Sequence, residues 1–473
     1  MASGGTWQTQ NKVRPGAYIN VVGVPKPLSK IGERGVVAVA MPLKWGEKIV
    51  EITSQEFLSG EGLIRAGVKY TDSNYIPTVP SSGVECAPGF ALRLILQNAS
   101  KAIIYRTNFT NSSAASKTIE DVCTITAKHP GSFGNKISFC IERQGAVGAY
   151  QYILKTFIDG ALSGTTKTST LTDIAGDSLI DISWDDDASW SASLATPANL
   201  TGGGDGESLD SNWLSDAISE FYSRSWNVFV CETTTASDHS QIKAAIEDLR
   251  DNNGEKVQAV LYNAALSTAD YEGIVNITEN TSYVISSGDI VRPSQTVFYV
   301  AGITAGASLT ESNSGEVVTD AVDLSGSGYP KTNEEITAAL NEGKYVLSRR
   351  ADGAIVVEKD INSLHTFTPT HGYIFSKQRP IRVLDTACND IKLLWCRSYL
   401  GKVSNDDAGR DVFKGDVIAY LNTLQNIGAI QNFDPDVDVE ISAGDDVDSV
   451  IVALWIQPVD SMEKLYLTIN VVG

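Results

Sequence analysis

The chain lacks the features that mark membrane-spanning and secreted proteins. Its 473 residues contain no apolar run of about 18 residues, the length at which a transmembrane helix is predicted. Residues 1–7 show no basic segment followed by an apolar one, which is the pattern of a secretion signal. We therefore expect a soluble protein that is made in a cytoplasm and has no membrane partner.

Cysteine is scarce, and its spacing fits neither a metal site nor a disulfide framework. The six cysteines are Cys86, Cys123, Cys140, Cys231, Cys388 and Cys396. No two of them form a C-x-x-C pair, the spacing that zinc ribbons use. We expect free, buried thiols and no bound metal.

Positive charge is in the minority, with a formal net charge of -20. This argues against a nucleic-acid partner, because phosphate binding needs clustered Lys and Arg. Residues 1–48 nevertheless hold seven Lys and Arg against two Glu, whereas residues 415–463 hold ten Asp and Glu and no Lys or Arg. A basic head and an acidic tail region favour head-to-tail association between copies. Two solvated faces without a partner remain the alternative.

Residues that could form a catalytic site are few. The chain has four histidines: His129, His239, His365 and His371. Asp238, His239 and Ser240 are the residue types of a hydrolase triad, but adjacent side chains diverge and cannot assemble one. No Gly-x-Ser-x-Gly elbow is present. We expect no catalytic residue and no cofactor, with a subtilisin-like hydrolase as the leading alternative.

Residues 202–206 (GGGDG) have the glycine content of a phosphate-binding loop. The Gly-Lys-Ser/Thr that would supply a cation and a metal-binding hydroxyl does not follow them. We predict instead a turn that leads into a helix starting near Leu209.

A run of carboxylates near the C-terminus is the best candidate for cation binding. Its acidic residues would share one face if the segment were extended: Asp434, Asp436, Asp438 and Glu440. As a calcium loop it fails, because Val439 stands where the sharp-turn glycine belongs and Asp445 where a bidentate Glu is usual. We interpret these residues as an acidic contact face, with a solvated strand or a calcium-dependent binding module as alternatives.

The order of apolar patterns predicts a multidomain fold of α/β plus β class. Strand-like and helical runs alternate over residues 31–117 and again over 205–365, which is typical of a mixed or parallel sheet with crossover helices. Short alternating segments rich in Ser, Thr and Gly between them predict a small antiparallel β domain. The predicted boundaries are 1–30, 31–117, 118–200, 201–365, 366–460 and 461–473.

Each end of the chain carries a short strand-like segment that cannot close a core alone. The first, residues 16–22, includes Tyr18, Ile19, Asn20 and Val21, and the basic residues Lys12 and Arg14 precede it. The second, residues 465–472, includes Leu465, Tyr466, Leu467 and Ile469. Neither has a hairpin partner close by in sequence. Both are candidates for adding to a sheet edge of another subunit.

Several distinctive segments follow one another along the chain. The first are residues 5–7 (GTW) and 11–20 (NKVRPGAYIN). Further blocks are residues 127–135 (AKHPGSFGN), 200–206 (LTGGGDG), 300–306 (VAGITAG), 382–405 and 462–466 (MEKLY). Taken in this order, they resemble segments of contractile phage tail sheath proteins, particularly those of Gram-positive myophages and PBSX-like prophage particles. The resemblance spans nearly the whole chain.

The resemblance implies a subtilisin-like α/β domain (201–365) without a triad, a β-sandwich inserted on the outside (118–200) and an α+β domain forming the inner wall (366–460). It further implies a non-enzymatic virion component, assembled in the host cytoplasm as hexameric rings stacked helically around a tail tube. The partners would be the tube, baseplate and tail terminator proteins. Arms 1–30 and 461–473 would link the rings, and contraction would drive the tube through the host envelope.

Overall fold

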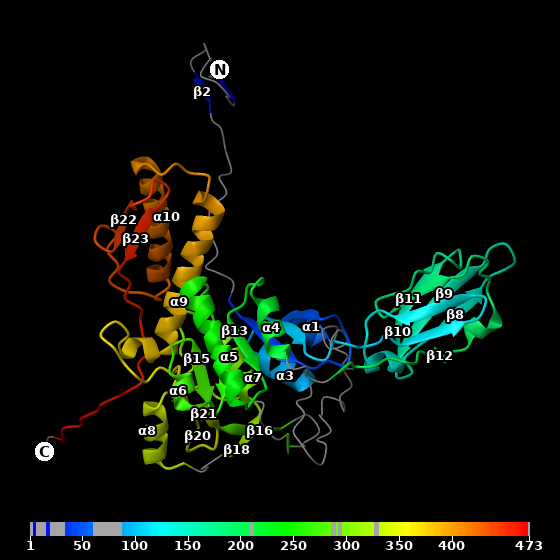
Figure 1. Cartoon of the computed structure of the whole chain (residues 1–473), viewed down its shortest axis with the longest axis horizontal. Helices are drawn as coiled ribbons and strands as arrows, with labels where there is room; N and C mark the ends of the chain where they lie inside the picture. The colour runs from blue at the N-terminus through cyan, green and yellow to red at the C-terminus, as the bar shows by residue number, and fades with distance from the viewer. Residues whose placement is uncertain are drawn as a thin grey trace.

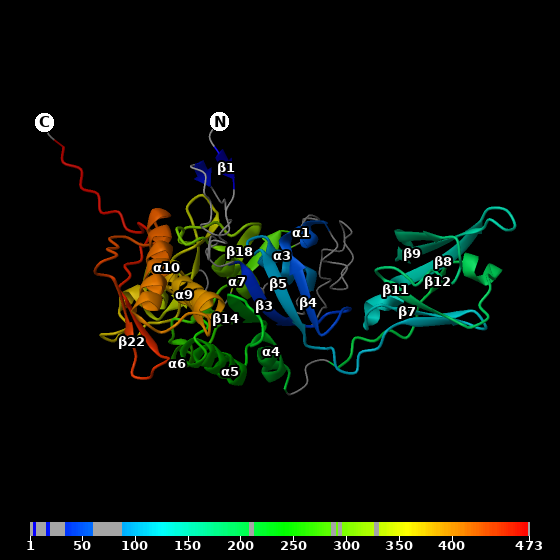
Figure 2. The same cartoon turned by 90° about the horizontal axis from the view of Figure 1, so that it is seen from above.

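The computed structural model describes residues 3–5, 16–18, 34–59, 88–207, 212–284, 290–291, 296–325 and 331–471. A central α/β body carries a β-rich unit on one side and a helical C-terminal unit on another (Figures 1 and 2). Both described chain ends run away from the body. The body contains the elements within residues 36–106 and 213–357, the β-rich unit those within 116–199, and the C-terminal unit those within 378–454.

A seven-stranded sheet in the order β19-β15-β14-β13-β3-β5-β4 forms the centre of the body. Every pairing is parallel except that of β4 with β5. This confirms the expected mixed sheet. Its strands are β3 Val36–Met41, β4 Ile49–Thr53, β5 Lys101–Arg106, β13 Val228–Cys231, β14 Gln258–Tyr262, β15 Ile274–Ile277 and β19 Lys344–Tyr345.

Helices cover both faces of this sheet, which explains why its strands are apolar at nearly every position. Val37 and Val39 of β3 face one apolar cluster, and Ala38 and Ala40 face the other. Helices on the first face are α3 Pro88–Leu96 and α7 Thr296–Gly306, and on the second α4 Trp213–Phe221 and α5 Ala236–Glu247. Gly302 lets α7 approach α3 closely, because a Cβ there would lie 2.7 Å from the Ile95 carbonyl oxygen.

Shorter elements complete the body. Three helices are α1 Ser54–Ser59, α6 Leu266–Ala269 and α8 Asn333–Asn341. A small sheet contains β16 Asn280–Val284, β17 Ile290–Val291 and β18 Ala321–Ser325, and a hairpin contains β20 Leu347–Arg349 and β21 Ile355–Val357.

The β-rich unit consists of two antiparallel sheets, in the orders β11-β7-β6 and β10-β9-β8-β12. This confirms the antiparallel strands expected here. Ile125 and Ile180 from one sheet and Phe139 and Leu154 from the other belong to one buried cluster. The strands are β6 Ser116–Ile119, β7 Cys123–Ala127, β8 Ile137–Gln144, β9 Gln151–Ile158, β10 Ala161–Thr168, β11 Ile180–Trp184 and β12 Ala198–Asn199.

The C-terminal unit packs two helices and a hairpin around a fourth apolar cluster. Its elements are α9 Gln378–Leu394, α10 Asp407–Asn426, β22 Val439–Ala443 and β23 Val450–Leu454. Val383, Ala387 and Leu394 of α9 face α10 within that cluster. The helix therefore has one apolar side toward α10, and its polar side faces the body.

The cysteines correct one expectation. Cys123, Cys140 and Cys231 are buried and free, as predicted, but Cys388 and Cys396 are exposed. Cys388 lies on α9, and Cys396 lies on the π-helical turn Trp395–Tyr399 that follows it. Cys86 lies outside the described residues.

Candidate inter-subunit surfaces

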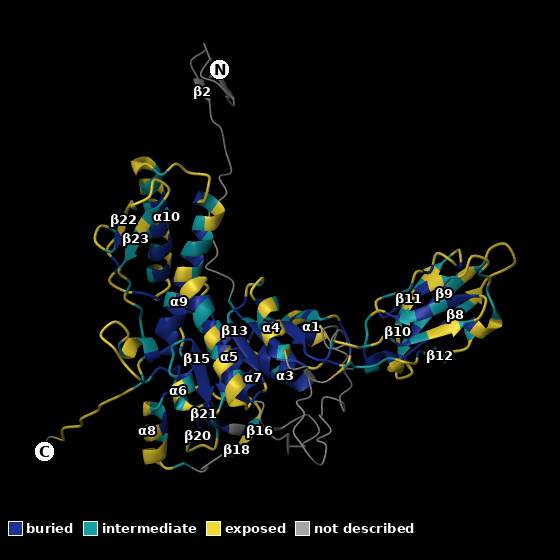
Figure 3. Ribbon diagram, viewed as in Figure 1, coloured by how far each residue is buried: buried dark blue, intermediate teal, exposed yellow. Residues whose placement is uncertain are grey.

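The last segment of the chain is apolar but exposed. Residues 459–471 contain no helix or strand. Leu465, Tyr466, Leu467, Ile469 and Val471 are each between 70% and 90% exposed. Figure 3 shows the segment as an exposed, extended stretch of chain that leads away from the body. A segment with the pattern of a strand has no strand partner here among the described residues.

At the other end, β2 (Gly16–Tyr18) pairs in parallel with β1 (Ser3–Gly5), so Tyr18 lies opposite Gly5. The segment thus has a parallel strand partner nearby in sequence. The sequence pattern did not indicate this partner, because glycine is depleted in strands and residues 3–5 are Ser-Gly-Gly. Neither β1 nor β2 pairs with a body strand. Ile19, Asn20, Val21, Lys12 and Arg14 lie outside the described residues.

The hairpin β22–β23 has two open edges. In an antiparallel ladder, residue pairs joined by backbone hydrogen bonds alternate with pairs that are not. The hydrogen bond from the Gly444 N–H to the Ser449 carbonyl identifies Gly444 and Ser449 as a bonded pair, and the register then assigns the other pairs. By this alternation, Ile441 on β22 and Val452 on β23 direct their backbone groups outward. No other strand within the described ranges pairs with either edge. Such edges accept added strands.

The acidic run before β22 is a turn and not an extended strand. The Asp438 carboxylate accepts a hydrogen bond from the Asp434 N–H at 2.8 Å, and the Asp434 carboxylate accepts one from the Asp436 N–H at 3.0 Å. These bonds close the turn, so the carboxylates do not share the single face that an extended segment would give them. Glu440 alone lies in β22. The other three carboxylates lie in the turn that directly precedes β22.

The exposed C-terminal segment is fixed where it leaves the body. Lys377, only 2% exposed, forms ion pairs with Glu463 and, at 3.4 Å, with Asp460. Glu463 also accepts a hydrogen bond from the Ser314 hydroxyl at 2.7 Å. Burial alone would raise the pKa of Glu463, but the bonds from Lys377 and Ser314 outweigh it and the pKa is lowered. We call residues 464–473 the C-terminal arm and this cluster its root.

A second charged contact lies where residues 1–33 join the body. Arg34 donates a hydrogen bond to the Thr386 hydroxyl on α9 at 2.8 Å. Burial, with the nearby cation Arg382, lowers the pKa of Arg34 to about 10, while Asp385 and Asp390 act in the opposite direction. Arg34 therefore remains cationic at neutral pH.

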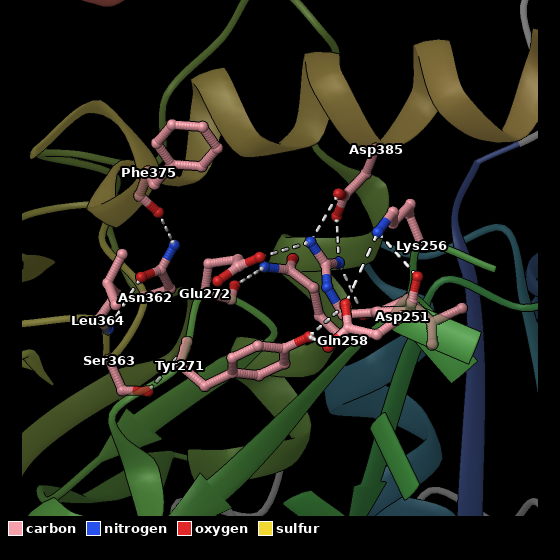
Figure 4. Close-up of polar contacts among 12 residues, drawn as sticks. Asp251, Lys256, Gln258, Tyr271, Glu272, Asn362, Ser363, Leu364, Phe375 and Asp385 are labelled. Carbon is pink, nitrogen blue, oxygen red and sulfur yellow. Dashed lines mark hydrogen bonds and ion pairs between the residues drawn. The ribbon is translucent and has the colours of Figure 1, made fainter. Parts of the chain in front are cut away.

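Buried polar contacts join α9 to the body. Arg250, 3% exposed, donates two hydrogen bonds to Asp385 at 2.8 and 2.9 Å. Figure 4 shows Asp385 reaching from the helix, with Gln258 and Glu272 approaching from the sheet side. Burial disfavours the cation, but Asp385 and Glu272 outweigh it, so the pKa of Arg250 is raised. The bidentate geometry fixes α9 in direction as well as position.

The β-rich unit is attached by a different device. Trp45, from the body, lies in the unit's apolar cluster, and its indole N–H donates to the His129 carbonyl at 2.6 Å. The buried Arg106 guanidinium donates to carbonyl oxygens of Gly46, Pro130 and Asp205. The joint between the body and the β-rich unit therefore includes segments 127–135 and 202–206.

Within this joint, the Asp205 carboxylate accepts bonds from the Ser132 N–H and hydroxyl. Segment 202–206 therefore docks onto the β-rich unit. Leu209, where a helix was predicted to start, lies outside the described residues, and α4 begins at Trp213.

The residues once considered for a triad are occupied elsewhere. His239 Nε2 lies 3.1 Å from the Thr233 carbonyl oxygen, Asp238 accepts from the Thr233 hydroxyl at 2.6 Å, and Ser240 donates to the Ala236 carbonyl. Among the described residues, no group of three or more His, Cys, Asp or Glu could hold a metal ion. None of the helices in the described ranges has the length and apolar composition needed to cross a membrane.

Comparisons with known proteins decide the family. Residues 210–363 match the phage tail sheath protein central domain, and residues 371–472 the phage tail sheath C-terminal domain. The phage-like element PBSX protein XkdK of Bacillus subtilis is 30% identical over 99% of this chain and 100% of its own length. The chain belongs to the phage tail sheath family. It is thus a structural subunit of a contractile tail sheath, located in the virion tail, and not an enzyme.

Solved structures agree with this assignment of the sheath subunit. A sheath tail protein of Desulfitobacterium hafniense is 30% identical, with 96% of this chain and 99% of that chain covered and a TM-score of 0.71. One from Listeria innocua is 26% identical over 93% and 95% of the two chains, with a TM-score of 0.76. The contracted helical sheath of the anti-feeding prophage, 14% identical with a TM-score of 0.54, shares the fold.

Proposed function

We propose that the sheath subunit assembles as hexameric rings stacked helically around a tail tube, and that its contraction drives the tube through the host envelope. The observation that carries the proposal is that one chain has both an exposed apolar C-terminal arm and a hairpin with two open edges. The partners are neighbouring copies, the tube protein, and the baseplate and tail terminator proteins.

The terminal segments serve as the links between copies in this proposal. Leu465, Leu467 and Ile469 would lie on one face of an extended strand. Added to a neighbour's hairpin, that strand would give its backbone groups partners and cover its apolar face. The basic Lys12 and Arg14 would carry the N-terminal arm toward the neighbour's acidic residues Asp434 and Asp436.

The three units take the roles expected for a sheath. The body is proposed to be the subtilisin-like domain without a triad, and the two-sheet unit the inserted β-sandwich on the outside. The C-terminal unit is proposed to form the inner wall. During contraction the units move as rigid bodies while the arm pairings persist, because backbone pairing tolerates rotation when the connecting segments bend.

Arm removal tests the proposal. Chains lacking residues 2–22, or truncated after Lys464 so that the root at Glu463 is kept, are compared with the full chain by thermal melting and by electron microscopy of polymers. Loss of striated tubes with a nearly unchanged monomer melt is expected, because the arms link copies and contribute little to one copy. Normal tube assembly, or collapse of the isolated subunit, would show that the arms pair within their own chain.

A further inference from the structure

Both arms leave the body at the same helix. Arg34, the first described residue after the N-terminal arm, is bonded to Thr386 at the middle of α9. Lys377, the residue immediately before α9, holds the root of the C-terminal arm through Glu463 and Asp460. The two contacts are nine positions apart on the helix, which corresponds to about 14 Å along its axis.

The helix is itself held by the body at successive turns, both between these two contacts and beyond Thr386. Positions spaced by three and four residues share one helix face, and five such positions bond to the body. They are Gln378 to Gln258, Arg382 to Asp360, Asp385 to Arg250, Asn389 to the Lys256 backbone, and Lys392 to Glu255. Its other face packs on α10. The helix therefore cannot turn or slide without breaking buried polar contacts.

Hydrogen bonds also connect the root of the C-terminal arm to the polar face of α9. The Ser314 hydroxyl that donates to Glu463 accepts a hydrogen bond from the Asp360 N–H at 2.9 Å. The Asp360 carboxylate in turn accepts from Arg382 of α9 at 3.3 Å. Ser314, Asp360 and Arg382 thus connect the arm root to the helix by a second path, separate from Lys377.

We propose that α9 is a rigid spacer that fixes the separation and direction of the two arm roots, so that two neighbouring copies are held at one register. Arg34, Lys377 and Glu463 are positioning residues in this scheme, because they set where each arm departs and do not themselves pair with a neighbour. The inference rests on the arm linkage proposed above. It adds that movement imposed on one arm reaches the other through a single helix.

The test compares root variants of the full chain. Lys377→Met removes the cation at the C-terminal root, and Thr386→Val removes one hydroxyl and no charge at the N-terminal root. The matched control is Lys155→Met, which removes an ion pair from β9 of the β-rich unit without touching α9 or either root. Polymers of each are imaged by electron microscopy, and the spacing and rotation between successive rings are measured. Monomer melts are recorded in parallel.

The control is expected to keep the single spacing of the full chain, whereas each root variant loses it and gives a broad distribution or no ordered polymer. The double variant should be the most disordered. If Lys377→Met lowers the monomer melt, Thr386→Val alone carries the test. Root variants with unchanged spacing and spread, or an equal loss in Lys155→Met, would overturn the inference. Failure of the arm linkage itself would appear separately, as normal tubes from the chain truncated after Lys464, which keeps the root.

Discussion

Two apolar segments of this chain, strand β13 and the C-terminal arm, end in opposite surroundings. Strand β13 pairs in parallel with β3 on one side and β14 on the other, and all of its residues are buried. Residues 465–471 have comparable apolar content but no strand partner and high exposure. A strand needs an edge to pair with as well as a suitable pattern. In the proposed arm linkage, a neighbouring copy supplies the edge that the arm lacks within its own chain.

The largest expected effect is the difference in monomer stability between a charge placed in β13 and a charge placed in the C-terminal arm. Val230→Asp in β13 places an unpaired charge at a fully buried position, so we expect a loss of more than about 4 kcal/mol in the free energy of unfolding. Leu467→Asp in the arm should leave the monomer melt unchanged and abolish tubes. Denaturant unfolding and electron microscopy provide the two readouts.

Val147→Asp, at an exposed position of the β-rich unit, is the matched control for an added surface charge. It should change neither readout. A destabilised Leu467→Asp monomer would mean that the arm packs on its own subunit, and the contrast with β13 would disappear.

The difference between buried and exposed positions also predicts which ion pairs contribute to the stability of the monomer. Asp385→Ala leaves the buried Arg250 guanidinium without its bidentate partner, so a loss of about 3–5 kcal/mol in the free energy of unfolding is expected. Asp352→Ala, which breaks an exposed Arg350 pair, should give no measurable change. Equal melts for the two variants would show that the junction of α9 with the body is not a structural anchor.

The β-rich unit should be dispensable for assembly, because it is attached at one joint and lies outside both matched sheath domains. Deleting residues 122–198 with a short Gly/Ser linker is expected to leave tube formation intact. The deletion would expose Trp45, now 1% exposed, so it is paired with Trp45→Ser to avoid a new apolar surface of about 200 Å². A truncated chain that folds but forms no rings or tubes would place this unit in the lattice.

The smallest effect concerns pH. The pKa of Glu463 is lowered in the folded chain, so its contribution to the arm root is present above the unfolded value of about 4.3 and is lost as the pH falls through the lowered value. Hydrogen–deuterium exchange of residues 459–464, corrected for intrinsic rates, should be faster at pH 3 than at pH 7. Glu463→Gln should flatten most of that change. Equal corrected rates in the unmodified chain would contradict the role of this carboxylate.

Periodicity alone predicts much of the fold. The apolar run in β13, the helical spacing near α4 and α10, and the short alternating strands of the β-rich unit are all local patterns. The segments resembling sheath proteins add the family. The adjacency of Asp238, His239 and Ser240 also correctly argues against a triad, since Asp238 and His239 both contact Thr233 and Ser240 bonds to Ala236.

Long-range contacts explain what the sequence could not predict. Trp45 lies in a cluster whose other members are far along the chain, and Arg106 is satisfied by carbonyls from three separate segments. The turn at Asp434 depends on side-chain bonds to its own backbone, which an alternation count overlooks. The polar face of α9 could have been found from the three- and four-residue spacing of Arg382, Asp385 and Asn389, had helix faces been compared.

Protection of the C-terminal arm from trypsin tests the central claim most directly. Lys464 follows the arm root, so cleavage after it releases only the residues proposed to pair with a neighbour. In the monomer this exposed site should be cut rapidly, and in tubes it should be protected, while a control site made by Val147→Arg should be cut in both. Equal cleavage after Lys464 in monomer and tubes would contradict the pairing of this arm with another copy.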